Sequence, residues 1–175
     1  MLLRNLEKQL KRLIKQGHSA LILGPRQVGK TTLIESLLKD KRNSMSFLLQ
    51  NPSTRMELEK DPAVLIRQIE ANKKRPLVFI DEAQKIPELF DAIQYLLDKN
   101  LASFIITGSS ARKLRRKGTN LLPGRIKYFH MDPFTYGELG LIKENYIPEL
   151  RWLSISRTIL LKKAWFLGRS RKTSP

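Results

Sequence analysis

The chain has 175 residues and a mass of 20.3 kDa, and 41% of its residues are hydrophobic and 28% charged. This length suits one globular domain with a sizeable core and leaves no room for a second full domain. The absence of cysteine excludes disulfides and thiolate metal sites and suits a reducing compartment. No apolar run approaches the roughly 18 residues that cross a membrane, and charged residues begin too early for a secretory signal, so we expect a cytoplasmic protein without a membrane span.

The chain is strongly basic. Its 33 lysine and arginine residues outnumber 16 acidic residues and give a formal net charge of +17. Residues 150–175 contain seven of the basic residues and no acidic one, so residues 1–149 carry +10. Such a balance suits nucleic acid or another anionic surface as a partner, although much of the excess lies near the end of the chain.

The first predicted element is an amphipathic helix over residues 3–16, which we expect to pack on the core. Its apolar residues recur at steps of three and four between charged ones and are Leu3, Leu6, Leu10, Leu13 and Ile14. The helix should end near Gly17, because glycine commonly terminates helices. Binding of a partner by this helix is the alternative interpretation.

A strand, a glycine-containing loop and a helix are predicted next. Residues 20–23 form the short apolar run of a buried parallel strand, and residues 33–38 repeat apolar side chains at helical spacing. Between them, residues 24–31 read GPRQVGKT and match GxxxxGK[ST], the phosphate-binding loop of nucleoside triphosphatases.

The chemistry of this loop follows from its residue types. Gly24 and Gly29 let the backbone turn without an obstructing Cβ, so successive N–H groups can converge on phosphate oxygens. The helix that starts near Lys30 adds its positive dipole end at the same point. Lys30 is the expected point charge for the β- and γ-phosphates, and the Thr31 hydroxyl is placed to hold Mg²⁺. A strand-to-helix turn without a ligand is the alternative.

A second strand is predicted at residues 46–50, followed by helices at residues 54–60 and 62–71. Asp61 would cap the second of these helices and Pro62 would occupy its first position.

A buried strand that ends in two acids is predicted at residues 77–80. The apolar residues LVFI are followed at once by Asp81 and Glu82, and such a pair is tolerated only at a strand end that opens onto a cleft. Open α/β sheets place ligands at the carboxyl ends of their strands. Asp81 is therefore expected to hold the Mg²⁺ shell and Glu82 to orient and deprotonate the attacking water, with diverging side chains because strand residues alternate in direction. A strand followed by a solvated acidic helix start is the alternative.

A helix around residues 89–97 and a buried strand at residues 104–106 follow, and the strand ends in the polar sequence TGSS. If this strand lies between the other two, Ser109 would face and sense the γ-phosphate; a simple turn serine is the alternative.

The basic cluster 112–117 is interpreted most simply as a solvated face. Residues 118–124 are predicted as a loop and residues 126–131 as a fifth strand.

Together these segments resemble prokaryotic ATPases of the AAA-like P-loop superfamily, in which the ATPase domain precedes a second domain. The motifs that carry the resemblance are GPRQVGKTTL, VFIDEAQKIPELF, ITGSSARKL, LPGRI and PFTYGEL, which occur in the family's order. The resemblance covers roughly residues 1–142. It implies an α/β protein with the P-loop NTPase fold, in which a parallel five-stranded sheet carries helices on both faces, residues 1–16 pack on the core and residues 17–142 form it.

The resemblance also implies ATP and Mg²⁺ as cofactors and assigns roles to individual residues. Lys30, Glu82, Ser109 and Arg125 would be catalytic. Arg125, in LPGR, would neutralise charge on the transferring phosphoryl group, in this chain or in a neighbouring subunit, with an ordinary surface ion pair as the alternative. Thr31 and Asp81 would bind the metal. The nucleotide would contact Gly24, Pro25, Arg26, Gln27, Val28, Gly29, Lys30, Thr31 and Thr32.

Residues 143–175 depart from the family pattern, because relatives continue into a sizeable second domain. We interpret this segment as a basic, atypical tail of a truncated or frame-altered product.

The leading functional hypothesis is an ATP-binding protein with weak or partner-dependent ATPase activity, acting with a protein partner or as a homo-oligomer. The alternatives are a module that binds nucleic acid weakly through its basic surface and a non-functional truncated fragment.

Overall fold

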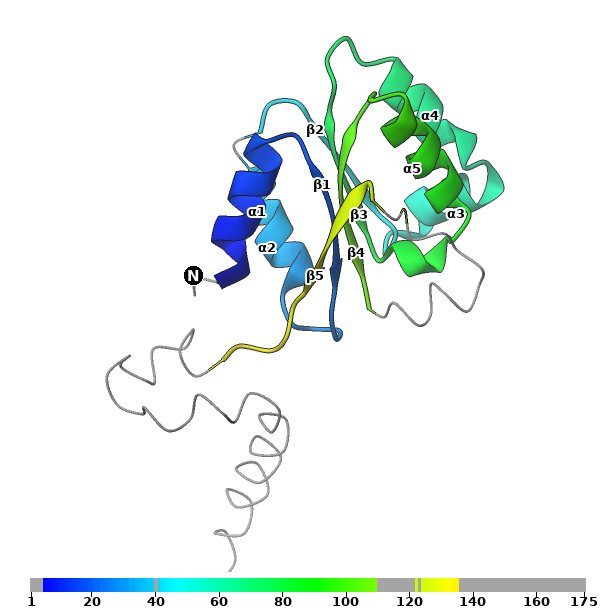
Figure 1. The fold of residues 1–175 in the computed structure, drawn as a ribbon. Coiled ribbons are helices and arrows are strands. Elements are labelled where there is room, and N and C mark those ends of the chain that lie inside the picture. Colours follow the sequence, from blue (N-terminus) through cyan, green and yellow to red (C-terminus); the bar gives the residue numbers. More distant parts are fainter. Residues whose placement is uncertain (1–4, 40, 110–121, 123, 136–175) are drawn as a thin grey trace, which may run out of the picture.

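The computed structural model describes residues 5–39, 41–109, 122 and 124–135. These residues form an α/β structure around one five-stranded sheet with the strand order β2-β3-β4-β1-β5 (Figure 1). All neighbouring strands pair in parallel, which confirms the predicted P-loop NTPase fold. The strands are β1 Ser19–Leu23, β2 Ser44–Leu48, β3 Leu77–Asp81, β4 Ser103–Gly108 and β5 Ile126–His130.

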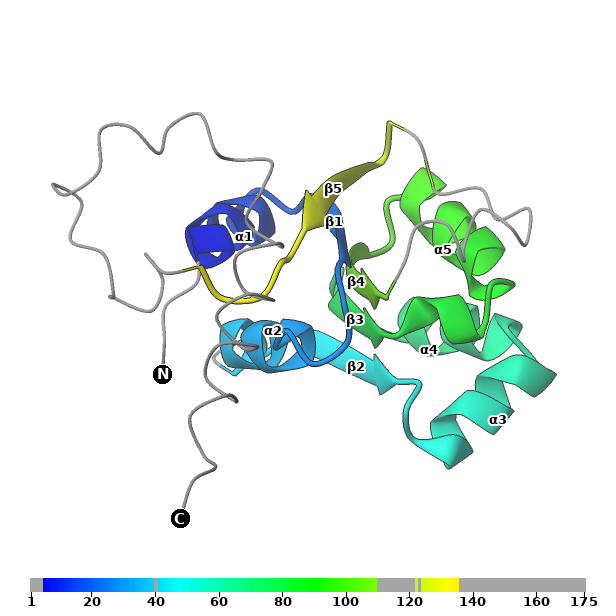
Figure 2. The same cartoon turned by 90° about the horizontal axis from the view of Figure 1, so that it is seen from below.

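Helices cover both faces of the sheet. One face is covered by α1 (Asn5–Lys15) and α2 (Lys30–Leu38), and the other face by α3 (Pro52–Lys60), α4 (Ala63–Glu70) and α5 (Leu89–Asp98). Figure 1 and Figure 2 show this arrangement from two directions. A short 3-10 helix, η1 (Ala83–Lys85), follows β3. Within the described ranges, no helix combines the length and apolar character needed to span a bilayer.

Two apolar cores lie on the two faces of the sheet, because successive strand residues point in opposite directions. In β3, Val78 and Ile80 belong to the core beneath α3, α4 and α5, whereas Leu77 and Phe79 belong to the core beneath α1 and α2. All four side chains are buried. A central strand that is covered on both faces therefore has a continuous apolar sequence, as residues 77–80 do.

The observed boundaries differ from the predicted ones where the sequence pattern is weak. β2 begins at Ser44 rather than at residue 46, because it is an edge strand whose Ser46 is exposed and whose sequence is not continuously apolar. After β2 the chain turns, and the Asn51 N–H donates to the Leu48 carbonyl oxygen at 2.9 Å. Residues 49 and 50, predicted as strand, belong to this turn.

Side-chain hydrogen bonds lie at the starts of α3 and α4. The Asn51 side chain accepts a hydrogen bond from the Ser53 N–H at 2.9 Å, so α3 begins at Pro52, before its predicted start at residue 54. The Asp61 carboxylate accepts the Ala63 N–H at 3.0 Å, but α4 begins at Ala63, one residue after its predicted start, so Pro62 rather than Asp61 is its N-cap residue. The basic cluster 112–117, most of the loop 118–124 and the tail 143–175 lie outside the described residues.

Candidate nucleotide-binding site

All the predicted site residues except Arg125 lie at the carboxyl ends of the central strands. The loop of residues 24–29 follows β1, Asp81 ends β3, and Ser109 follows β4. β4 lies between β3 and β1, which is the strand order on which the predicted role of Ser109 depended. A pocket of about 620 Å³ opens here and is lined by Arg26, Gln27, Gly29, Lys30, Thr31, Thr32, Gln50, Glu82 and Lys85.

The two loop glycines are required for different reasons. A Cβ on Gly24 would lie 2.1 Å from the carbonyl oxygen of Met131, so the backbone at the start of the loop passes too close to the end of β5 for any side chain. A Cβ on Gly29 would meet nothing within 4 Å, but Gly29 has φ +88°, which L side chains rarely adopt. Gly29 directly precedes α2, and its carbonyl oxygen accepts the Leu33 N–H at 3.0 Å.

Lys30 reaches back across its own loop. Its Nζ donates to the carbonyl oxygens of Gly24 at 2.9 Å and Pro25 at 2.6 Å, and the residue is only 5% exposed. Burial lowers the pKa of the Lys30 ammonium below its ordinary value of 10.5, and the nearby carboxylates of Glu82 and Asp81 oppose this shift. The site therefore contains a buried cation whose charge is poorly solvated, which favours binding of an anion.

Thr31 and Asp81 meet directly. The Thr31 hydroxyl donates to Asp81 Oδ2 at 2.9 Å, and the Gln50 amide lies 3.4 Å from the same oxygen. Asp81 is 1% exposed, and its other oxygen, Oδ1, accepts a hydrogen bond from the Thr107 hydroxyl. A buried carboxylate with hydroxyl partners on both sides is held in one orientation.

The residues present fit Mg²⁺. A hydroxyl and a carboxylate are the hard oxygen ligands that this ion prefers, and Mg²⁺ usually takes its remaining ligands from phosphates and water. Among the residues that the structure describes, no group of three or more His, Cys, Asp or Glu side chains could hold a metal without such help. Thr31 and Asp81 would therefore hold the ion together with a bound nucleotide.

Glu82 does not continue the strand, which corrects one prediction. Its φ of 58° is left-handed, and it caps η1 rather than alternating with Asp81 along β3. The Glu82 N–H donates to the Thr107 hydroxyl oxygen at 3.1 Å, and its carboxylate accepts a hydrogen bond from the Gln84 amide. The separation of the two acidic side chains thus results from a turn in the backbone and not from the pleat of a strand.

Sequence reasoning did not single out Thr107 or Gln84. The Thr107 hydroxyl lies between the two acids, donating to Asp81 and accepting from the Glu82 backbone. Gln84 connects Glu82 to the end of β4. Its Oε1 accepts the Ser109 N–H at 3.2 Å, and its amide donates to the Glu82 carboxylate. The only signal for Thr107 was a polar residue at the end of the apolar run 104–106.

Ser109 and Arg125 differ in position. Ser109 lies at the end of β4 beside the pocket residues, and its buried hydroxyl has no hydrogen-bond partner within the described part of the chain. Arg125 directly precedes β5, so it lies at the amino ends of the parallel strands, whereas the pocket lies at their carboxyl ends. Its side chain pairs with the carboxylate of Asp98 at the end of α5. The structure therefore does not bring Arg125 to the pocket of its own chain.

Comparison with known proteins agrees with this geometry. A protein-family model described as an AAA domain matches residues 16–140. The chain therefore belongs to the AAA-domain family of P-loop ATPases.

Two curated relatives are 31% identical to the chain over 139 residues: the uncharacterized protein Rv2008c of Mycobacterium tuberculosis and the uncharacterized protein Mb2031c of Mycobacterium bovis. The match covers 78% of the chain but 30% of each relative. The chain thus matches less than a third of the length of these proteins.

Solved structures show the same fold. The Walker-type ATPase PABY2304 of Pyrococcus abyssi is 18% identical with a TM-score of 0.55, and the match covers 79% of this chain and 55% of that one. The Orc1 protein of Aeropyrum pernix, solved in complex with DNA, is 13% identical with a TM-score of 0.60, over 80% of this chain and 48% of that one.

Proposed function

We propose that this chain binds ATP with Mg²⁺ and hydrolyses the β–γ phosphoanhydride bond, slowly by itself or in dependence on a partner. The observation that carries the proposal is the hydrogen bond between Thr31 and Asp81. It brings the phosphate loop and the acidic strand end, fifty positions apart in sequence, into one pocket. The cytoplasm, where ATP and Mg²⁺ are available, is the location that we propose.

Binding would use the loop amides and Lys30. A bound polyphosphate would offer the Lys30 ammonium anionic oxygens in place of the two loop carbonyls that it now contacts. Thr31 and Asp81 would hold Mg²⁺, which would supply charge neutralisation for the phosphate oxygens.

Hydrolysis would use Glu82 as the group that orients water and accepts its proton. Thr107 fixes the Glu82 backbone, and Gln84 holds the Glu82 carboxylate. Because the Glu82 carboxylate already accepts this hydrogen bond, it is less available to the attacking water, and we expect the chain alone to hydrolyse ATP slowly. Ser109, whose hydroxyl is buried and unpaired among the described residues, would donate to the transferring phosphoryl group.

The test compares the parent chain with Lys30→Ala and Glu82→Gln. The parent should bind ATP and release phosphate in Mg²⁺ but not in EDTA. Lys30→Ala should lose binding, whereas Glu82→Gln should keep binding and lose turnover, because the amide cannot accept the proton. A parent that binds no ATP would refute the proposal. The alternative of nucleic-acid binding depended on the basic surface of residues 112–127 and on the tail. Of the basic residues concerned, the structure describes only Arg125 and Lys127, and Arg125 pairs with Asp98, so the described residues give this alternative no specific support.

A further inference from the structure

Lys85 lines the pocket but is not among the predicted site residues. It lies at the end of η1, in the turn that follows Asp81 and Glu82, and it lines the pocket together with Gln50. Gln50 follows the edge strand β2, whereas the phosphate loop follows β1, and β3 and β4 lie between these strands. Lys85 and Gln50 therefore form the wall of the pocket on the far side of the acids from the loop.

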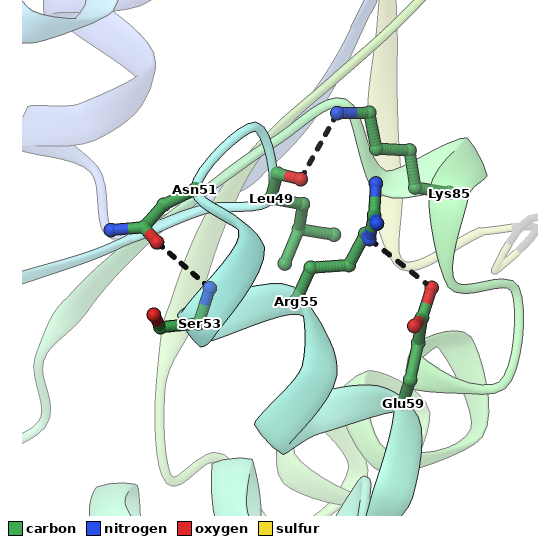
Figure 3. Close-up of polar contacts among 6 residues, drawn as sticks. All are labelled: Leu49, Asn51, Ser53, Arg55, Glu59 and Lys85. Atoms are coloured by element: carbon green, nitrogen blue, oxygen red, sulfur yellow. Dashed lines mark hydrogen bonds and ion pairs between the residues drawn. The ribbon is translucent and has the colours of Figure 1, made fainter.

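The backbone around Lys85 is firmly anchored. Ala83, at the start of η1, and Ile86, directly after Lys85, are 0% and 1% exposed, so both ends of the turn are fixed in the core. The Lys85 Nζ donates to the carbonyl oxygen of Leu49 at 3.0 Å (Figure 3). Leu49 is itself fully buried. The ammonium group is thus held at the pocket wall by a rigid acceptor and is not a freely moving surface charge.

Lys85 differs from Arg55, on α3, in how its charge is neutralised. The Arg55 Nε lies 3.5 Å from the Glu59 carboxylate, an ion pair drawn in the same view (Figure 3). Lys85 forms no ion pair with any carboxylate within residues 5–39, 41–109, 122 and 124–135, and its one observed acceptor is a neutral carbonyl. An ammonium has three N–H donors. One donor is used by Leu49, so Lys85 retains two N–H donors and a positive charge that no ion pair within the described residues neutralises, and both are available to a ligand in the pocket.

We propose that Lys85 binds the terminal phosphate of a bound triphosphate and so favours ATP over ADP. This inference rests on the proposed function. Thr31 and Asp81 would hold the metal, which would neutralise charge on the terminal phosphates of the nucleotide. Lys85 lines the same pocket as Lys30, Thr31 and Glu82. A triphosphate held by the loop would extend one phosphate further into this pocket than a diphosphate, so only its terminal phosphate would reach Lys85.

The experiment measures binding by calorimetry with the full chain and Mg²⁺. The ligands are ADP and an ATP analogue with a non-hydrolysable imido group between the β- and γ-phosphates. The proteins are the parent, Lys85→Met, Lys85→Arg and the control Lys60→Met, which removes an exposed lysine at the end of α3. Lys85→Met should weaken binding of the analogue about tenfold or more, the size expected for a hydrogen bond between charged groups.

ADP affinity should stay within about twofold in Lys85→Met, because ADP lacks the phosphate concerned. Lys85→Arg should largely restore the preference, and Lys60→Met should match the parent. The ratio of the two affinities in one preparation is independent of how much protein is folded. An unchanged ratio in Lys85→Met, with or without a lower melting temperature, would mean that Lys85 only anchors the turn to Leu49. A parent that binds neither ligand would overturn the proposed function together with this inference, whereas an unchanged ratio overturns the inference alone.

Discussion

The Thr31 hydroxyl donates a 2.9 Å hydrogen bond to the carboxylate of Asp81, across fifty positions of sequence. The contact exists because β1 and β3 both flank β4 and run parallel to it. Parallel strands end at the same edge of the sheet, so the residues that follow β1 and end β3 come together. The predictions below test what this convergence does.

Thr31→Ala should weaken the contribution of Mg²⁺ to nucleotide binding. The variant loses one oxygen ligand for the ion, so we expect its ATP affinity in Mg²⁺ to fall about tenfold, towards the value measured in EDTA. Thr31→Ser keeps the hydroxyl and serves as the control. Titrations of all three proteins with and without Mg²⁺ decide the matter, and equal loss in both conditions would contradict a metal role.

Thr107→Val should destabilise the chain and reduce turnover. The replacement has a similar shape but leaves a buried Asp81 oxygen without its donor and the Glu82 N–H without its acceptor. Loss of one partner of a buried polar pair costs about 1–3 kcal/mol. Denaturant unfolding measures the cost, and phosphate release measures the effect on Glu82.

Ser19→Ala is the matched control for Thr107→Val. The Ser19 hydroxyl accepts the Phe104 N–H at 2.9 Å, also between β1 and β4, but at the start of β1, opposite the pocket. We expect a comparable loss of about 1–3 kcal/mol with nucleotide binding and turnover retained by the folded protein. Similar loss of turnover in both variants would show that Thr107 acts through stability alone.

Nucleotide affinity should fall at alkaline pH because of Lys30. Burial lowers the pKa of Lys30 below 10.5, and a bound polyphosphate would raise it again, so binding takes up a proton as the pH rises through the lowered pKa. Calorimetry at several pH values, in buffers of different ionisation enthalpy, measures this uptake. Lys30→Arg should bind with no such dependence, because arginine stays protonated throughout.

The same shift has an effect on stability with the opposite trend. Between the lowered pKa of folded Lys30 and its ordinary value of 10.5, the unfolded chain binds more protons than the folded chain. The contribution of Lys30 to the free energy of unfolding therefore rises with pH in this window. If Lys30 is the source, the free energy of unfolding of the parent minus that of Lys30→Met should increase with pH across this window.

Gly24→Ala should be more damaging than Gly29→Ala. A Cβ at residue 24 collides with the Met131 backbone, which can move only if β5 moves, and we expect a cost of about 3 kcal/mol or more. At residue 29 the space is open and the cost is only the left-handed conformation, about 1–2 kcal/mol. Denaturant midpoints of the two variants give the order directly, and the reverse order would refute this account of the loop.

Much of the fold was predictable because its signals are local. The apolar runs of β1, β3 and β4 are continuous, since central strands are covered on both faces. The phosphate loop was evident from two spaced glycines followed by Lys30 and Thr31, between an apolar strand and a helix. β2 was misplaced by two residues at each end, because an edge strand has no continuous apolar pattern, and its limits depend on pairing with β3.

By itself the sequence determined the phosphate loop, the acids after a buried strand and the helices that cover the sheet, because each depends on residues close together in the chain. Only the tertiary structure decided which groups orient those acids. Thr107 reaches Asp81 and Glu82 because β4 lies beside β3, and Gln84 reaches Glu82 and Ser109 through a left-handed turn. Such contacts depend on strand order and on one backbone torsion angle, and neither leaves a periodic pattern in the sequence.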